Sequence, residues 1–145
     1  MSELEALLAR IPYLAPHGLQ AVQAADGSVT VHQPFRPALA NYVGIVHAGA
    51  IYTLAETAAG IVANELVTHL GGFILLSGAS VRYTRRVEGD ASATARADGA
   101  AAAAALARFE TEARAEITIG VVVTTPDGET AFTGSFDYAL RRRKP

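Results

Sequence analysis

The stretch from residue 41 to residue 70 most constrains the fold, because a loop rich in small residues runs there into a long, nearly uncharged helix. The only formal charges in this stretch are Glu56 and Glu65. A helix this apolar is expected to be buried over most of its circumference. A carboxylate at the middle of such a helix therefore needs a structural or chemical reason.

On a helical wheel, Glu56 belongs neither to the broad apolar face of this helix nor to the face that carries its threonines. It shares a third stripe with Tyr52, Ala59, Gly60 and Ala63. The small residues of this stripe would let a flat ligand or another backbone approach closely. We therefore interpret Glu56 as a candidate catalytic base.

The loop before the helix supplies candidate hydrogen-bond donors. His47, Ala48 and Gly49 lie where the first N–H groups of the helix are unpaired, and such a terminus favours anions and developing oxyanions. A carbonyl oxygen bound to the Ala48 and Gly49 amides would place its carbon within reach of a group one or two turns along the helix. Glu56 is such a group.

Composition indicates a small globular domain. A chain of 145 residues, of which 50% are hydrophobic, is expected to form one domain over residues 1–145. Charged residues make up 18% and the formal net charge is -2, so neither disorder nor a general attraction to nucleic acid is expected. The expected partner is a small molecule or a second copy of the chain.

The sequence has no cysteine, which excludes disulfides, thiolate metal sites and cysteine nucleophiles. The first ten residues predict a short amphipathic helix and not a secretory signal, because they lack an apolar core with a cleavage site. Residues 37–81 carry only two charges but contain no run of 18 apolar residues, so no membrane insertion is expected. We therefore expect a cytoplasmic protein.

The first half of the chain predicts a hairpin, the long helix and an extended strand. Residues 19–33 hold two short stretches around an Asp26-Gly27 turn, and the helix is expected to end near Gly71. Residues 73–88 predict one long strand that alternates throughout. One face of this strand would carry Leu75, Ser77, Ala79, Val81 and Tyr83.

The second half predicts three more strands and a short helix. Residues 91–97 form a strand whose inner face is alanine, so something large must pack against it, and the central helix is the obvious candidate. Residues 99–114 favour a helix, with an extended strand end as the alternative. Alternation over residues 117–140, around a Pro126-Asp127-Gly128 turn, predicts a closing hairpin. The expected class is α+β, with an antiparallel sheet covering one helix.

The pattern of Asn41, His47-Ala48-Gly49 and Glu56 resembles the motif of the hotdog-fold acyl-CoA thioesterase superfamily. The resembling branch is that of the phenylacetate-pathway (PaaI-like) thioesterases, which carry Asn, then His-Gly-Gly, then an acidic residue at the same spacing. The likeness covers nearly the whole chain. It implies the hotdog fold, in which an antiparallel β-sheet wraps around one long central helix.

The resemblance also implies an activity. It implies hydrolysis of an acyl-CoA thioester by a homodimer or a homotetramer (a dimer of dimers), with active sites at the subunit interface. By position, Asn41 would orient the carbonyl, the Ala48 amide would be the oxyanion donor, and Glu56 would activate water or attack directly. Ser77 would lie near a serine that some relatives use to hold the water.

The chain departs from this motif at two positions. Ala48 stands where the family has Gly, and a backbone N–H survives that change if φ stays negative. Glu56 stands where the family has Asp, and its extra methylene shifts the carboxylate by about a bond length. The choice between water activation and direct attack stays open.

Structural alternatives exist for each catalytic candidate. Glu56 could be a buried carboxylate paired with Arg82 or Arg85. Asn41 could be a turn residue, and His47 could be a helix cap or a loop tether. The motif spacing favours catalysis for Glu56, whereas for His47 a structural role is favoured, as the group that holds the oxyanion loop.

Five residues are candidates for substrate contact besides Ser77. Tyr52 and Ala59 would line an acyl slot between the helices of two subunits. Arg82, Arg85 and Arg86 could contact the phosphates of coenzyme A through charge-assisted hydrogen bonds. A solvated strand end explains these arginines equally well, and the basic end of the chain is interpreted as a solubilising tail.

Motifs for other chemistries are missing from the sequence. The four histidines lack metal-ligand spacing, no Gly-rich loop ends in Lys-Ser or Lys-Thr, and no Gly-x-Ser-x-Gly elbow is present. We therefore expect no metal and no cofactor. The rival functions are a non-catalytic acyl-thioester binding or assembly protein of the same fold, and a hydratase or dehydratase, whose His and acid spacing is not found here.

Overall fold

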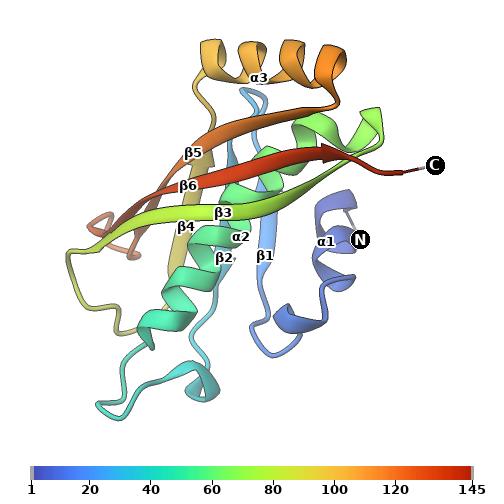
Figure 1. The fold of residues 1–145 in the computed structure, drawn as a ribbon. Helices are drawn as coiled ribbons and strands as arrows, with labels where there is room; N and C mark the ends of the chain where they lie inside the picture. The colour runs from blue at the N-terminus through green and yellow to red at the C-terminus, as the bar shows by residue number, and fades with distance from the viewer. Residues whose placement is uncertain (1, 145) are drawn as a thin grey trace.

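The computed structural model describes residues 2–144. Met1, the first residue of the predicted N-terminal helix, and Pro145, the last residue of the basic tail, lie outside the described residues. A 20-residue helix, α2, lies at the centre, and a six-stranded antiparallel sheet curves around it in the order β1-β2-β4-β5-β6-β3 (Figure 1). This confirms the predicted α+β class and the sheet wrapped around one long helix. The strands are β1 (Gln20–Gln23), β2 (Val29–Gln33), β3 (Gly72–Tyr83), β4 (Ala91–Arg96), β5 (Arg114–Thr124) and β6 (Thr130–Arg142).

The helices are α1 (Glu3–Ala9), α2 (Ala48–Val67) and α3 (Gly99–Glu112), with short 3-10 turns η1 (Pro12–Leu14), η2 (Pro37–Leu39) and η3 (Thr68–Leu70). The predicted N-terminal helix is confirmed as α1. Its N-terminus is stabilised by a capping box formed by Ser2 and Glu5. Past η3, Gly71 takes the left-handed conformation at φ 74°, so the long helical segment ends where the paired glycines predicted.

Small residues let α2 lie close to the sheet. Ala55, Ala58 and Ala59 of α2 are all 0% exposed, as are Ala93 and Ala95 of β4. Alanine on both sides of the contact shortens the distance at which helix and strand can pack. The prediction that the central helix covers the alanine face of residues 91–97 is therefore confirmed.

The predicted strand over residues 73–88 differs from β3 in two ways. The strand ends at Tyr83, because the N–H groups of Thr84 and Arg85 turn toward the Ala131 carbonyl at 2.9 and 3.3 Å. Its register against β6 also shifts between Leu76 and Gly78. A bulge inserts one residue and exchanges the two faces, so the prediction of uninterrupted alternation was wrong.

The alternative left open for residues 99–114 is settled in favour of a helix. Asp98 caps α3, because its side chain accepts a hydrogen bond from the Ala101 N–H at 3.0 Å. The helix packs on β5 through Ala105 and Phe109, of which Phe109 is fully buried. The N-terminal segment, α1 and η1, lies beside α2 at the opening between the edge strands β1 and β3 (Figure 1).

None of the helices within residues 2–144 combines the length and the apolar character that crossing a bilayer requires.

Replacing Ala93 by Leu tests the close contact between helix and sheet. Ala93 is 0% exposed beneath α2, so the added methylenes force strain into a filled interface and should lower the free energy of unfolding by about 1–3 kcal/mol. Urea denaturation measures this change. Arg96→Leu, on an exposed position of the same strand, is the control and should cost less than about 1 kcal/mol. Equal losses for the two variants would contradict the proposed interface.

Candidate active site

One stripe of α2 remains partly open to solvent. Tyr52, Glu56, Gly60 and Asn64 follow one another at intervals of four and are half-buried, whereas the residues between them are buried. Ala59, which was predicted to line an acyl slot, is instead 0% exposed against the sheet, and Ala63 is too. Of the predicted stripe, Tyr52, Glu56 and Gly60 therefore lie on the open side of the helix, whereas Ala59 and Ala63 are buried.

The carboxylate of Glu56 is held by a tyrosine from β6. The Tyr138 hydroxyl donates a hydrogen bond to Glu56 Oε2 at 2.7 Å, and it also lies 3.1 Å from the Glu56 carbonyl oxygen. Arg85 pairs instead with Glu129 at 3.7 Å, so the alternative of a Glu56–Arg85 ion pair was wrong. A carboxylate has about four acceptor positions, so this contact orients Glu56 without saturating it.

The tyrosines around Glu56 are held in the protonated form. Burial raises the pKa of Tyr138 well above its usual 10.0, and the negative charge of Glu56 raises it further. Burial also raises the pKa of Tyr52, and the Glu56 charge adds to that effect. At neutral pH Tyr138 is therefore a neutral donor, which positions Glu56 while adding no positive charge that would pair with it.

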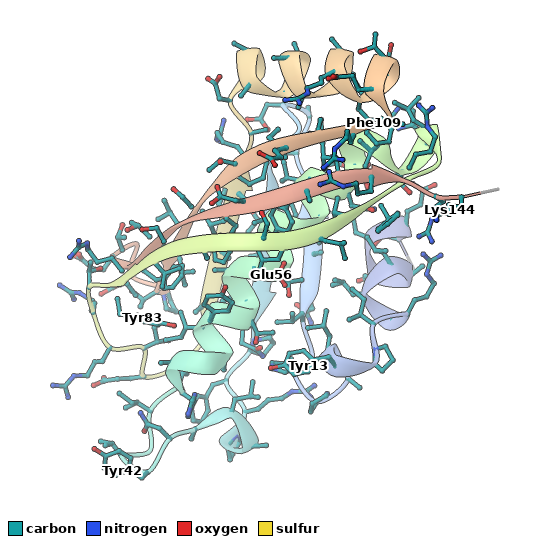
Figure 2. The ribbon with its side chains drawn as sticks, viewed as in Figure 1. Tyr13, Tyr42, Glu56, Tyr83, Phe109 and Lys144 are labelled. Carbon is teal, nitrogen blue, oxygen red and sulfur yellow. The ribbon has the colours of Figure 1, made fainter. Side chains whose placement is uncertain are left out.

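Glu56 borders a cavity of about 360 Å³. Figure 2 shows Glu56 near the middle of α2, with Tyr13 of the N-terminal segment below it. The cavity lies between this segment and the open stripe of α2, and its walls are mostly aliphatic. The aliphatic walls come from Leu7, Leu8, Ile11, Leu14, Ile61 and Ile74.

The start of α2 is organised by His47. Its Nδ1 accepts a hydrogen bond from the Gly49 N–H at 2.7 Å, so the ring caps the helix and uses one of the two predicted oxyanion donors. This is the cap alternative foreseen for His47. Tyr83 of β3 donates to the Ala48 carbonyl at 2.8 Å. The Ala48 N–H has no acceptor within residues 2–144, so it is the donor available to a ligand.

Asn41 lies in the loop before the helix as a turn residue. Its Oδ1 accepts hydrogen bonds from the N–H groups of Val43 at 2.9 Å and Ile45 at 3.3 Å. Its backbone N–H donates to the Ile45 carbonyl at 2.7 Å. The side-chain oxygen is thus committed to the loop, and the Nδ2 group is the part of Asn41 that could meet a substrate oxygen.

A single chain does not bring the helix start and Glu56 together. Ala48 and Glu56 are eight positions apart on one straight helix, which corresponds to about 12 Å along its axis. Reacting atoms must approach within about 3–3.5 Å. The expectation that a carbonyl on the Ala48 amide reaches Glu56 of the same chain therefore does not fit the geometry.

The remaining predicted contact residues lie away from the Glu56 cavity. Ser77 is at the bulge of β3 and donates to the Asp137 carbonyl at 3.1 Å. Arg82 is exposed on β3, and Arg85 and Arg86 lie in the loop that follows. Arg86 makes an exposed contact with Glu88 at 3.9 Å. The structure does not gather these residues around Glu56.

Sequence reasoning missed the partner of Glu56. Tyr138 was placed only in the alternation of the last strand, yet an inward-facing tyrosine usually needs a hydrogen-bond partner for its hydroxyl. A carboxylate on a buried helix needs a donor for the same reason. A hydrogen bond between Tyr138 and Glu56 could therefore have been predicted from the sequence. No sequence signal indicated that Tyr13 lines the cavity.

A family model covers most of the chain. It matches residues 3–140, and its description is a domain of unknown function, DUF4442. The chain belongs to the DUF4442 family. No curated protein matches the sequence.

Solved structures share the architecture of this DUF4442 member. A probable thioesterase from Pseudomonas aeruginosa is 24% identical, with a TM-score of 0.81, over 97% of this chain and 94% of that chain. A variant of another Pseudomonas aeruginosa thioesterase is 18% identical, with a TM-score of 0.77, over 97% and 95%. A Chlorobaculum tepidum protein of unknown function is 16% identical, with a TM-score of 0.84, over 97% and 93%. The chain therefore has the hotdog fold, as the motif predicted.

Alkaline denaturation tests the contact between Tyr138 and Glu56 in this DUF4442 member. Because the folded pKa of Tyr138 lies above its ordinary value of 10.0, its contribution to stability is complete below about pH 10 and is lost as the pH rises further. Without the titrating hydroxyl, Tyr138→Phe should lose less unfolding free energy than the native protein above pH 10. The difference in slope should be up to about 1.4 kcal/mol per pH unit. Urea denaturation between pH 8 and 11.5 measures it.

Tyr42→Phe is the control for this experiment, because Tyr42 is 100% exposed. Its unfolding free energy should follow that of the native protein at every pH. Parallel curves for the native protein and Tyr138→Phe would contradict the assignment.

Proposed function

We propose that this protein is an acyl-CoA thioesterase in which Glu56 activates water. The observation that carries the proposal is a carboxylate oriented by a neutral tyrosine, at 2.7 Å, beside a largely apolar cavity. A base in such a place can accept a proton from water while the apolar walls receive an acyl group. The hotdog fold shared with proteins named as thioesterases supports the same reaction class.

The proposed reaction uses two copies of the chain. Because Ala48 and Glu56 of one chain lie about 12 Å apart along α2, the oxyanion donor for one Glu56 comes from the helix start of a second copy. A two-fold axis places each helix start beside the other Glu56 and creates two equivalent sites. Two half-sites that are each incomplete thus support a homodimer.

Strand β3 supplies the proposed dimer contact. It is an edge of the sheet, and an unpaired edge is a template for another strand. Leu75 is 56% exposed, Leu76 41% and Val81 37% on this strand. Pairing β3 of one copy with β3 of the other would cover these side chains and continue the sheet between subunits.

In the proposed chemistry, the thioester carbonyl oxygen accepts a hydrogen bond from the Ala48 N–H of the second copy. Glu56 takes a proton from a water molecule while the oxygen of that water bonds to the carbonyl carbon. The negative charge develops on the carbonyl oxygen. The carbon–sulfur bond then breaks. The thiolate takes the proton from Glu56, so free acid and coenzyme A leave and Glu56 is again ionised.

The remaining candidate residues take supporting roles in this proposal. His47 holds the helix start by capping Gly49, and Asn41 shapes the loop while its Nδ2 group faces the carbonyl. Arg82 and Arg85 bind phosphates of coenzyme A, since exposed pairs such as Arg85–Glu129 are weak enough for phosphate to replace. The PaaI-like branch is the subgroup whose motif spacing supports these roles.

One observation favours the non-catalytic rival. His47 occupies the Gly49 N–H at 2.7 Å, which leaves a single amide of the helix start for an oxyanion. A binding module would bind the same thioesters without turnover. The thiol-release measurement separates the two functions, because only the enzyme frees coenzyme A.

Glu56→Gln tests the proposed base. The amide keeps the size of the side chain but cannot accept a proton, so kcat for acyl-CoA hydrolysis should fall about 10²–10⁴-fold. Thiol release across short, long and aromatic acyl-CoAs measures this. Glu65→Gln is the matched control on the same helix, because Glu65 is exposed, and it should keep native activity. Native turnover in Glu56→Gln would refute the assignment.

Val81→Lys tests the proposed dimer. A lysine on the exposed edge of β3 opposes strand pairing through charge and desolvation, so the protein should become monomeric and lose hydrolysis together. Light scattering after size exclusion gives the mass. Val22→Lys, on the opposite edge strand β1 and 59% exposed, should leave both unchanged. A monomeric variant that retains full activity would exclude the shared site.

A further inference from the structure

The cavity beside Glu56 extends along α2 toward the C-terminal end of that helix. Its volume of about 360 Å³ falls within the range of small-molecule sites, which is about 300–1,000 Å³. The N-terminal segment forms the opposite wall with Leu7, Leu8, Ile11 and Leu14. Apart from the Glu56 carboxylate, the Asn64 amide and the Tyr52 hydroxyl, the residues that line the cavity are apolar or carry groups that are already hydrogen-bonded.

The threonine hydroxyls of the cavity already donate hydrogen bonds within the protein and need no partner from a ligand. Thr53 Oγ1 donates to the Gly49 carbonyl at 2.9 Å, and Thr57 Oγ1 donates to the Thr53 carbonyl at 2.6 Å. Tyr13 Oη lies 3.4 Å from Thr53 Oγ1, within hydrogen-bond distance. These hydroxyls are bonded within the protein, so they leave mostly carbon surface for a ligand.

Gly60 keeps the path open next to the carboxylate. A Cβ at this position would lie 3.2 Å from Glu56 Oε2, 3.6 Å from Tyr138 Oη and 3.7 Å from Ile74 Cδ1. Glycine inside a helix is destabilising relative to alanine. Its presence one turn after Glu56 therefore leaves room where the carboxylate meets the aliphatic walls.

The length of the path sets the length of chain that it can hold. From Glu56 to Asn64 the helix advances eight positions, which is about 12 Å. An extended alkyl chain with bonds of about 1.5 Å advances about 1.25 Å per carbon, so about ten carbons fill this distance. Asn64 then places a polar amide at the end of the apolar stretch.

We propose that the cavity between α2 and the N-terminal segment is the acyl site, and that it selects straight acyl chains of about eight to ten carbons. The proposal rests on the thioesterase function proposed above, and it assigns specificity to the N-terminal segment. Leu7 and Ile11 belong to the aliphatic wall opposite α2. Neither residue belongs to the catalytic machinery.

Two measurements test this site. Thiol release from acyl-CoAs of four to sixteen carbons should show kcat/KM rising about two- to fourfold per methylene up to about ten carbons and then levelling. Calorimetry with the thioethers butyl-CoA and decyl-CoA, which cannot be hydrolysed, should show at least tenfold tighter binding of decyl-CoA. Binding of these thioethers does not depend on turnover.

Ile11→Asp is the decisive variant. Ile11 is 39% exposed, so the change is tolerated by the fold. It places a charge in the aliphatic wall, where a ten-carbon chain has far more apolar surface to lose than a four-carbon chain. It should weaken decyl-CoA binding and decanoyl-CoA kcat/KM at least tenfold, while changing the four-carbon compounds less than twofold. Ile11→Ala, which removes wall surface without adding charge, should give a smaller loss in the same direction.

Val122→Asp is the matched control, because Val122 is 40% exposed on β5 and does not line the cavity. It should retain the native chain-length profile. Equal effects of Ile11→Asp on four- and ten-carbon compounds, or native behaviour toward both, would overturn the acyl site. Selective binding of decyl-CoA without any thiol release would refute the proposed enzyme but leave this site in place.

Discussion

The close contact between α2 and the curved sheet is the constraint on which the rest of the structure depends. Alanines on the helix and on β4 are fully buried, so the backbone of α2 lies near the strands. This proximity brings the hydroxyl of Tyr138, on β6, within 2.7 Å of Glu56. Larger side chains in the same contact would separate the helix from the sheet and leave the carboxylate without its donor.

The same packing leaves one stripe of α2 for chemistry. The sheet closes around the helix except between its edges β1 and β3, where the N-terminal segment lies (Figure 1). This segment forms the outer wall of the cavity beside Glu56. The only carboxylate that lines this cavity is Glu56, among the residues that the structure describes. A base, an apolar cavity and an unpaired sheet edge thus arise from one arrangement, and each supports the proposed two-copy thioesterase.

Much of the fold could be predicted because the signals are local. The Asp26-Gly27 turn, the alanine face of β4 and the alternation of β5 each depend on neighbouring residues, and the structure confirms them. The bulge at Ser77 and the strand end at Tyr83 escaped prediction, because they depend on pairing with β6. Of the candidate site, Glu56 was found through its unusual place on an apolar helix.

The sequence by itself determined the long apolar helix with one central carboxylate, and the motif of Asn41, His47 and Glu56 within an antiparallel α+β chain. Only the tertiary structure decided how much of the predicted stripe of α2 stays open, since Ala59 and Ala63 are buried while Gly60 borders the cavity. It also decided that Tyr138, 82 residues away, holds the carboxylate. Such partners are chosen by how a sheet curves around a helix, which no local pattern encodes.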